Sequence, residues 1–366
     1  MLRYVELSTL GSAARVLVDD TPTDGSGPVM WPSMGEYPVY DASLYQALAS
    51  DEARNERFRA ALGALAPNKV VLDIGTGQQV LWARESLHAG ARHAVAMEVM
   101  DHAFAVAARN IDAWGLTDVV TLLRGASTEL SLDSPADVCV AEIIGSVAGA
   151  EGAAVVLDDA RRRLLGPGGA VVPHRCVTQA AAVSLRDVFR GREPAFAPEA
   201  VPLLERIMRA NGGPFDVRLR IRRPGLDAVI SSEAAVEILD FNGDLRTEQE
   251  QKVTLTIERP GRVDGILTWL RIACLPGEPP LDALRDDTSW ASVYFPLFEH
   301  EVRVEPGDRL DLLFRTILSD DGTHPDYYLE GTLRTAAGTF SARHFSPHHG
   351  DALHSHPWYD RLIRTP

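Results

Sequence analysis

Cysteine, lysine and long apolar runs are all scarce in this chain of 366 residues. The three cysteines, Cys139, Cys176 and Cys274, stand far apart in apolar segments, which excludes a disulfide framework or a zinc spacing and predicts buried, reduced thiols. No apolar run approaches the roughly 18 residues of a membrane span, and the first residues lack a basic segment followed by an apolar one. We therefore expect a cytoplasmic protein with no membrane partner.

Basic residues are also fewer than acidic residues. Lysine and arginine total 36 against 51 aspartate and glutamate, and the resulting net charge of −15 repels nucleic acid, so we expect no nucleic-acid partner. With 45% hydrophobic and 24% charged residues, the chain has the balance of a folded protein. Its length predicts two domains, each large enough to bury a core.

The first half of the chain has the pattern of an α/β domain. Residues 1–36 are an N-terminal segment that ends in a loop rich in Pro, Gly, Ser and Asp at 20–36. A helix is predicted at about 41–65, with a break where Asp51 acts as a new N-cap. From residue 69, short β-branched runs alternate with helical stretches, which is typical of βαβ units in a parallel sheet. We place this Rossmann-like domain at 37–173.

The second half, at 174–366, has a different pattern. Strand-like runs separated by Gly, Pro and Asp predict antiparallel β-structure, a sandwich or a barrel, and we favour a β-barrel domain. One helical insert, at about 194–212, interrupts the strands. It has an apolar face formed by Leu203, Leu204, Ile207 and Met208.

An apolar strand runs into the turn Asp73-Ile74-Gly75-Thr76-Gly77, and the next strand ends at Glu98. Glycines let the backbone approach a ligand at the sheet edge, and an acidic side chain about twenty residues later can accept ribose hydroxyls. The third glycine that a pyrophosphate site needs is Gln79 here, which favours S-adenosylmethionine over a dinucleotide. The alternative is that the glycines only make a tight turn.

Two carboxylates, Glu142 and Glu151, bracket a loop of small residues after another strand. If the loop folds over, they face each other and form a receptor for a planar cation such as a guanidinium, which accepts one carboxylate on each side. The alternative is that Glu142 caps a helix and Glu151 is solvated.

These segments together resemble one family. DEAR at 51–54, VLDIGTG at 71–77, AMEV at 96–99, STEL at 127–130, the two glutamates and VPHR at 172–175 occur in the order and spacing of the protein arginine methyltransferases. The resemblance extends from about residue 37 to 185 and continues more weakly into the β half. STEL and VPHR are most similar to the monomethylating, type III branch.

The resemblance implies S-adenosylmethionine as the cofactor. Arg54 corresponds to the arginine that holds the cofactor's carboxylate, the turn at 73–77 lines its methionine part, and Glu98 binds its ribose. The serine and threonine of STEL stand where the family contacts adenine. The cofactor-binding residues implied are Arg54, Asp73, Gly75, Gly77, Glu98, Ser127 and Thr128.

The resemblance also implies the acceptor site. Glu142 and Glu151 match the double-glutamate loop that grips a guanidinium, and we assign them the catalytic role. TSW at 288–290 stands where the family has a Thr-His-Trp loop, so that Trp290 walls the pocket by stacking on the cation. Ser289 and Tyr45 are predicted to bind the substrate with it.

Three departures from the family pattern bear on activity. Gln78 and Gln79 replace a Thr-Gly or similar pair, Ser289 replaces the loop histidine, and small residues at 145–148 replace bulky side chains between the glutamates. A larger side chain at Gln79 narrows the cofactor site, which keeps a non-catalytic homologue as an alternative. The trimmed loop puts protein substrates in doubt.

We therefore predict an S-adenosylmethionine-dependent N-methyltransferase of a guanidino group, with free L-arginine or a small guanidino metabolite of a bacterial biosynthetic pathway as the acceptor. Two carboxylates concentrate the positive charge away from the attacking nitrogen, and no metal is required. The alternatives are protein arginine methylation, a non-catalytic homologue, and methylation of an oxygen or carbon acceptor.

Two further features lie in the second half. The helical insert stands where family members carry a dimerisation arm, which predicts a homodimer unless its apolar face packs on its own barrel. Five histidines crowd the C-terminus, and without a regular spacing we expect a solvated or packed tail rather than a metal site. They are His344, His348, His349, His354 and His356.

Overall fold

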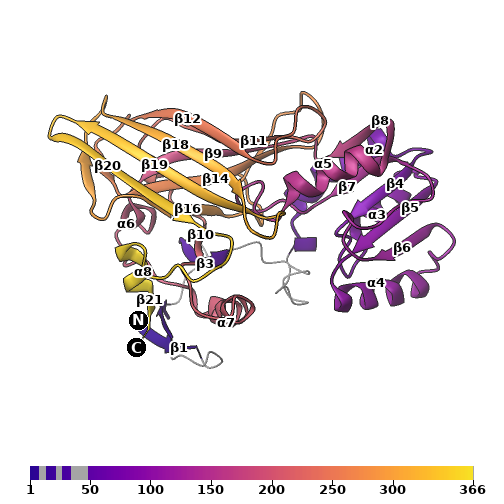
Figure 1. The fold of residues 1–366 in the computed structure, drawn as a ribbon, viewed down its shortest axis with the longest axis horizontal. Helices are drawn as coiled ribbons and strands as arrows, with labels where there is room; N and C mark the ends of the chain where they lie inside the picture. Colours follow the sequence, from indigo (N-terminus) through magenta and orange to yellow (C-terminus); the bar gives the residue numbers. More distant parts are fainter. Residues whose placement is uncertain (8–13, 22–26, 34–47, 366) are drawn as a thin grey trace.

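The computed structural model describes residues 1–7, 14–21, 27–33 and 48–365. One part is a five-stranded parallel sheet in the order β6-β5-β4-β7-β8, flanked by helices (Figure 1). Its strands are β4 (Val70–Ile74), β5 (His93–Glu98), β6 (Val120–Arg124), β7 (Ala136–Ala141) and β8 (Leu165–Val172). Its helices are α2 (Glu52–Leu65), α3 (Leu81–His88), α4 (Asp101–Ala113) and α5 (Ala153–Arg163). The α/β class predicted from the sequence is confirmed.

The order of the strands fixes where a ligand can bind. The apolar strands β4, β5 and β7 are buried almost throughout, as expected of a sheet covered on both faces. The chain moves outward from β4 through β5 to β6, and then returns to the other side of β4 with β7. The strands are parallel, so their carboxyl ends meet at one edge, and the reversal opens a crevice there.

The predicted helix at about 41–65 is described from residue 48 onward. Helix α2 begins after Asp51, whose side chain accepts a hydrogen bond from the backbone N–H of Arg54. This is the N-cap that the sequence predicts, because a short acidic side chain satisfies a backbone donor in the first turn. The earlier part of the prediction lies outside the described residues.

The second half of the chain, joined by residues 29–33 of the N-terminal segment, forms antiparallel sheets. A seven-stranded sheet has the order β11-β9-β14-β16-β10-β3 with β15 paired to β14, and a four-stranded sheet has the order β12-β18-β19-β20. The larger sheet contains β3 (Val29–Ser33), β9 (Arg175–Val183), β10 (Arg218–Arg222), β11 (Ala234–Asp240), β14 (Gly265–Ala273), β15 (Leu281–Asp282) and β16 (Ser292–Pro296). The smaller sheet contains β12 (Gln249–Thr256), β18 (Arg309–Leu318), β19 (Pro325–Thr335) and β20 (Gly338–Ser346).

The two sheets bury one shared core. Phe295 of β16 packs edge to face against Phe314 of β18 and Tyr327 of β19, and all three rings are buried. No hydrogen-bonded ladder closes these sheets into a ring among the described residues. The antiparallel domain is therefore confirmed, whereas the β-barrel form that we favoured is not confirmed.

Smaller elements, including two strands near the N-terminus, complete the antiparallel part. They are the strands β1 (Leu2–Glu6), β2 (Arg15–Asp19) and β21 (Ile363–Arg364), the two-stranded pair β13 (Gly261–Val263) and β17 (Val302–Val304), and the helices α6 (Leu185–Val188), η2 (Pro198–Ala200), α7 (Val201–Ala210), η3 (Leu226–Ala228) and α8 (Pro357–Leu362). Strand β3 lies within the predicted loop at 20–36. Its Pro32 is tolerated because β3 is the edge strand, paired only with β10.

The apolar face of α7 is covered within the chain. Leu203, Leu204, Ile207 and Met208 belong to one buried cluster with Phe215, and each is at most 2% exposed. This is the packing that we gave as the alternative to a dimer contact, so these side chains do not support the homodimer, which stays a prediction.

The remaining general predictions concern thiols and membranes. Cys139, Cys176 and Cys274 are free and buried, as predicted. Burial raises the pKa of each thiol, which keeps it protonated and unreactive. Over the described part of the chain, no helix combines the length and the apolar character needed to cross a membrane.

Candidate active site

A cavity of about 390 Å³ opens at the carboxyl edge of the parallel sheet. It is lined by the segments that follow β4, β5, β6 and β7, which is where the strand order predicts a ligand. Asp73, Ser289 and Trp290 do not line it, and Tyr45 lies outside the described residues. Eight of the residues predicted for the site do line it, namely Arg54, Gly75, Gly77, Glu98, Ser127, Thr128, Glu142 and Glu151.

The glycine turn after β4 needs both of its glycines. Gly75 and Gly77 have φ angles of 73° and 66°, a left-handed backbone that other residues adopt at a cost. A β-carbon on Gly75 would also lie 2.9 Å from Cγ2 of Ile143. Val80, at the start of α3, has a φ of 50°, a strained conformation for a β-branched residue.

Glu98 is held from behind by backbone donors. Its Oε2 accepts the N–H of Gly77 at 2.8 Å and its Oε1 accepts the N–H of Met100 at 2.8 Å. Burial raises the pKa of Glu98, and these hydrogen bonds oppose that shift. Each carboxylate oxygen has a second lone pair, so the side chain can still accept hydroxyl groups from the cavity.

Asp73 lies behind the turn rather than in the cavity wall. Its Oδ2 accepts the hydroxyl of Thr76 at 2.6 Å and the N–H of Ala83 at 2.8 Å, which ties the turn to α3. Complete burial raises the pKa of Asp73 to about 7. Its Oδ1 has no hydrogen-bond partner among the described residues. We had expected Asp73 to line the site, and the structure instead places it one layer behind.

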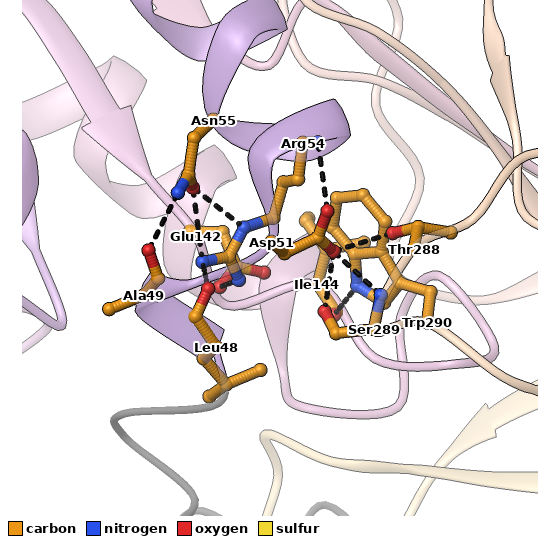
Figure 2. A network of polar contacts seen from close by, with 10 residues as sticks. All are labelled: Leu48, Ala49, Asp51, Arg54, Asn55, Glu142, Ile144, Thr288, Ser289 and Trp290. Atoms are coloured by element: carbon orange, nitrogen blue, oxygen red, sulfur yellow. Dashed lines mark hydrogen bonds and ion pairs between the residues drawn. The ribbon is translucent and has the colours of Figure 1, made fainter. Parts of the chain in front are cut away.

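Arg54 is the central cation of the site (Figure 2). It is 2% exposed, and its Nη1 donates to Oε2 of Glu142 at 2.6 Å. Its Nη2 also donates to the carbonyl of Leu48. The guanidinium carbon lies 5.9 Å from the centre of the Trp82 ring and 6.0 Å from that of Trp290. These contacts restrict an otherwise flexible side chain to one position.

Glu142 has a strongly perturbed carboxyl group. Burial raises its pKa to about 7, although the positive charge of Arg54 lowers it and the negative charge of Asp51 raises it further. Glu142 and Glu151 line the same cavity, so the structure brings the two predicted carboxylates to one site. A buried carboxyl with a shifted pKa in a cleft is typical of a functional group.

The loop between the two glutamates is anchored to the antiparallel half. The N–H of Ala148 donates to Oγ1 of Thr178 at 3.0 Å, and the N–H of Gly149 donates to Oε2 of Glu237 at 3.2 Å. Trp290 donates from its indole N–H to the carbonyl of Ile144 at 2.8 Å (Figure 2). Trp290 was predicted to wall the acceptor pocket, and in the structure it braces this loop and packs near Arg54.

Asp51 joins the two halves at the start of α2 (Figure 2). One of its oxygens caps the helix, and the other accepts the Thr288 hydroxyl at 2.6 Å and both the N–H and the hydroxyl of Ser289 at 2.6 and 2.7 Å. Burial tends to raise the pKa of Asp51, but these hydrogen bonds lower it overall. Ser289 therefore binds Asp51 rather than facing the cavity. The sequence revealed the cap but gave no signal for this contact.

The turn between β18 and β19 also reaches the cavity, which sequence reasoning missed. Asp321, Thr323 and His324 line it beside Glu151. A β-carbon on Gly152 would lie 2.8 Å from Cγ2 of Thr323, so the turn touches the start of α5 directly. The DGTH sequence at 321–324 indicates a turn, but not which part of the chain the turn meets.

The chain is similar to a known protein family and to several known proteins. A family model described as ribosomal protein L11 methyltransferase matches residues 59–163. The chain is 30% identical over 276 residues to the arginine N(omega)-methyltransferase of Streptomyces achromogenes subsp. streptozoticus, covering 73% of this chain and 74% of that protein. It is 29% identical over 242 residues to protein arginine N-methyltransferase 7 of Drosophila grimshawi, covering 61% of this chain and 34% of that protein.

A solved structure supports the fold. The Trypanosoma brucei protein arginine methyltransferase 1 enzyme–prozyme heterotetrameric complex with AdoHcy is similar at a TM-score of 0.66 and 17% sequence identity. The match covers 84% of this chain and 99% of that chain. The alignment with the Drosophila relative spans only about a third of that protein's length.

The Asp51 contacts predict a stability effect. Asp51→Ala removes a helix cap and three further hydrogen bonds to a charged acceptor, so we expect the free energy of unfolding at pH 7 to fall by at least about 2 kcal/mol. The lowered pKa means that this stabilisation is present at neutral pH and is lost only as acid protonates the folded carboxylate. Chemical denaturation measures the change. Glu56→Ala, on the exposed face of α2, is the control at about 0.5 kcal/mol or less; equal values for both variants would contradict the role of Asp51.

Proposed function

This chain belongs to the arginine N-methyltransferase family, whose members use S-adenosylmethionine, and from that premise we propose that its acceptor is free L-arginine or another small guanidino compound. The observation that carries the proposal is the β18–β19 turn. Asp321, Thr323 and His324 line the cavity with Glu151, and the turn contacts the chain directly after that glutamate. A wall from the second half at this end leaves room for a small molecule more readily than for a peptide.

The relatives support the same choice. The Streptomyces protein is named for arginine and the Drosophila protein for protein arginine, and the alignment covers 74% of the first but 34% of the second. The loop between the glutamates also consists of small residues, including Gly145, Ser146 and Ala148. Methylation of arginine in proteins is the alternative outcome.

We propose that the cavity residues divide between cofactor and acceptor. Glu98 accepts the ribose hydroxyls through its remaining lone pairs, the backbone of Gly75 and Gly77 borders the methionine part, and Ser127 and Thr128 border the adenine. Arg54 binds the carboxylate. These residues fit S-adenosylmethionine because the left-handed glycines leave the cavity edge free of side chains and Glu98 offers two acceptor oxygens. When bound, S-adenosylmethionine supplies the electrophilic methyl group of a sulfonium.

We propose that Glu142 and Glu151 hold the acceptor guanidinium. Both carboxylates line the cavity, and two anions on one guanidinium draw its charge away from the third nitrogen, which then attacks with more electron density. Burial strengthens these ion pairs relative to water. Fixing the nitrogen in one orientation supplies a further part of the rate.

We also propose that the protein is a cytoplasmic homodimer. Free, buried cysteines fit a reducing compartment, and the similar Trypanosoma structure is a multi-subunit complex. A dimer contact must use a surface other than the apolar side of α7, because that side is already buried in its own chain.

The substrate proposal is tested by mass spectrometry. The purified protein is incubated with S-adenosylmethionine and, in separate reactions, free L-arginine or an arginine-rich peptide. We expect a mass increase of one or more methyl groups on the free amino acid. Glu142→Gln is the control, and it should give much less methylated product in the same time. Methylation of the peptide alone would overturn free arginine as the acceptor and leave the family activity intact.

The raised pKa of Glu142 predicts a pH dependence. Because this pKa is about 7 in the free protein, Glu142 loses its charge as the pH falls below that value, and kcat/KM for arginine should fall with it. Glu142→Gln should lower kcat/KM on the order of a hundredfold at pH 8 and remove this acid limb. Glu129→Gln, an exposed glutamate, serves as the control. A kcat/KM that stays level from pH 5.5 to 8 would rule out this role.

A further inference from the structure

A histidine and an aspartate are paired in the turn between β18 and β19. Oδ2 of Asp321 lies 2.6 Å from Nδ1 of His324. Oδ1 of the same carboxylate accepts the N–H of Thr323 at 2.8 Å, the N–H of His324 at 2.9 Å and the hydroxyl of Ser319 at 2.9 Å. Partial burial tends to raise the pKa of Asp321, but these hydrogen bonds hold it well below its usual range. Asp321 is therefore an anion at any working pH.

This pairing fixes the tautomer and the orientation of the imidazole. A carboxylate at Nδ1 accepts the proton of that nitrogen, which leaves the lone pair of the neutral ring on Nε2. The ring of His324 stacks on that of His348 with the centroids 4.2 Å apart and the planes within 3°. Burial lowers the pKa of His348 to about 3, so the stacking partner is neutral.

The imidazole lies at the acceptor end of the cavity. His324 lines the same cavity as Glu142 and Glu151. A β-carbon built on Gly152, the residue after Glu151, would lie 3.7 Å from Cδ2 of His324. Since Cδ2 is bonded to Nε2, the Nε2 edge of the ring borders the segment that carries the second glutamate.

A metal site is the alternative interpretation of the cluster of Asp321, His324 and His348. One ligand atom from each of Asp321, His324 and His348 lies within 4.8 Å of the others. A metal binds an imidazole nitrogen in the plane of the ring, at about 2.0–2.1 Å. The two stacked rings have nearly parallel planes, so their lone pairs do not converge on one ion, and Nδ1 of His324 already contacts Asp321. The geometry favours a proton acceptor.

We propose that His324, oriented by Asp321, accepts the proton that the guanidinium loses during methyl transfer. The N–CH₃ bond forms as the S–CH₃ bond breaks and its electron pair stays on sulfur. An N–H bond of the same nitrogen breaks, and its proton passes to Nε2 of His324. The products are a methylguanidinium, a neutral thioether and an imidazolium whose Nδ1 stays paired with Asp321. The Ser289 that stands at the family's histidine position is bound to Asp51 and lies outside this cavity.

The charges around His324 determine how a pH profile is interpreted. A saturating guanidinium keeps Glu142 ionised, so the titration of Glu142 affects kcat/KM rather than the transfer rate at saturation. His348 is neutral, and His349 contacts Asp320 at 2.8 Å on the outer side of the turn. Within the described part of the chain, the titratable and charged groups around this turn include Glu142, Glu151, Asp320, Asp321, His348, His349 and Arg218.

Single-turnover kinetics test the inference on the intact protein. The rate of methyl transfer is measured from pH 5.5 to 9.5 at saturating S-adenosylmethionine and with whichever acceptor the wild type methylates. His324→Asn keeps a donor to Asp321 but removes the proton acceptor, so we expect the rate at pH 7.5 to fall at least tenfold, with the KM for the acceptor within threefold. The acid limb of the wild-type rate should disappear. His349→Asn, with its outward-facing side chain, should stay within twofold of the wild type.

Each result decides the inference. A His324→Asn rate within threefold of the wild type, a raised KM at unchanged rate, or an unchanged acid limb would overturn it, as would a wild-type rate lost on chelator dialysis and restored by zinc. If His324→Asn does not fold, the inference is tested by comparing the pH profile of Asp321→Asn with that of the wild type. Asp321→Asn should shift the acid limb of the methyl-transfer rate. The inference rests on the proposed function for its guanidinium acceptor. Failure of free arginine as a substrate would be seen in the wild type, whereas failure of His324 as the base is seen only in the comparison of variants.

Discussion

The ion pair between the buried Arg54 and the partly buried Glu142 is the contact on which the site depends. Its atoms approach to 2.6 Å, Arg54 is 2% exposed, and removing one partner of such a pair leaves an uncompensated charge that typically costs about 3–5 kcal/mol. In the proposed function Arg54 serves the cofactor and Glu142 the acceptor. The cation proposed for one ligand therefore contacts the anion proposed for the other, and we expect the two binding events to be coupled.

The antiparallel half holds the segments around this ion pair in place, although it contributes neither of the two charged residues. Asp51 holds the TSW segment against the start of α2, and Trp290 of that segment donates to the carbonyl two residues after Glu142. Glu237 and Thr178 hold the middle of the glutamate loop, and Thr323 meets its end. The loop that carries both glutamates is thus fixed by contacts from strands far away in the sequence.

Much of the fold and part of the site can be predicted from local patterns. The alternation of strands and helices, the Asp51 cap, the left-handed glycines and the position of Glu98 at a strand end all follow from short stretches of sequence. Interactions between distant segments do not. Ser289 was expected in the cavity because of the motif it belongs to, but its bonds go to Asp51. His324 was not predicted because its turn lies about 170 residues from the loop it contacts. The closure of the β-sheets depends on edge pairing that strand patterns do not specify.

The coupling between Arg54 and Glu142 is tested most directly by calorimetry of L-arginine binding to the wild-type protein, with and without saturating S-adenosylhomocysteine. A ligand carboxylate competes with Glu142 for Arg54 and frees Glu142 for the acceptor. We therefore predict that L-arginine binds at least tenfold more tightly in the presence of S-adenosylhomocysteine, a difference of about 1.4 kcal/mol. Equal affinities under the two conditions would contradict the coupling and, with it, the division of the cavity between these two residues.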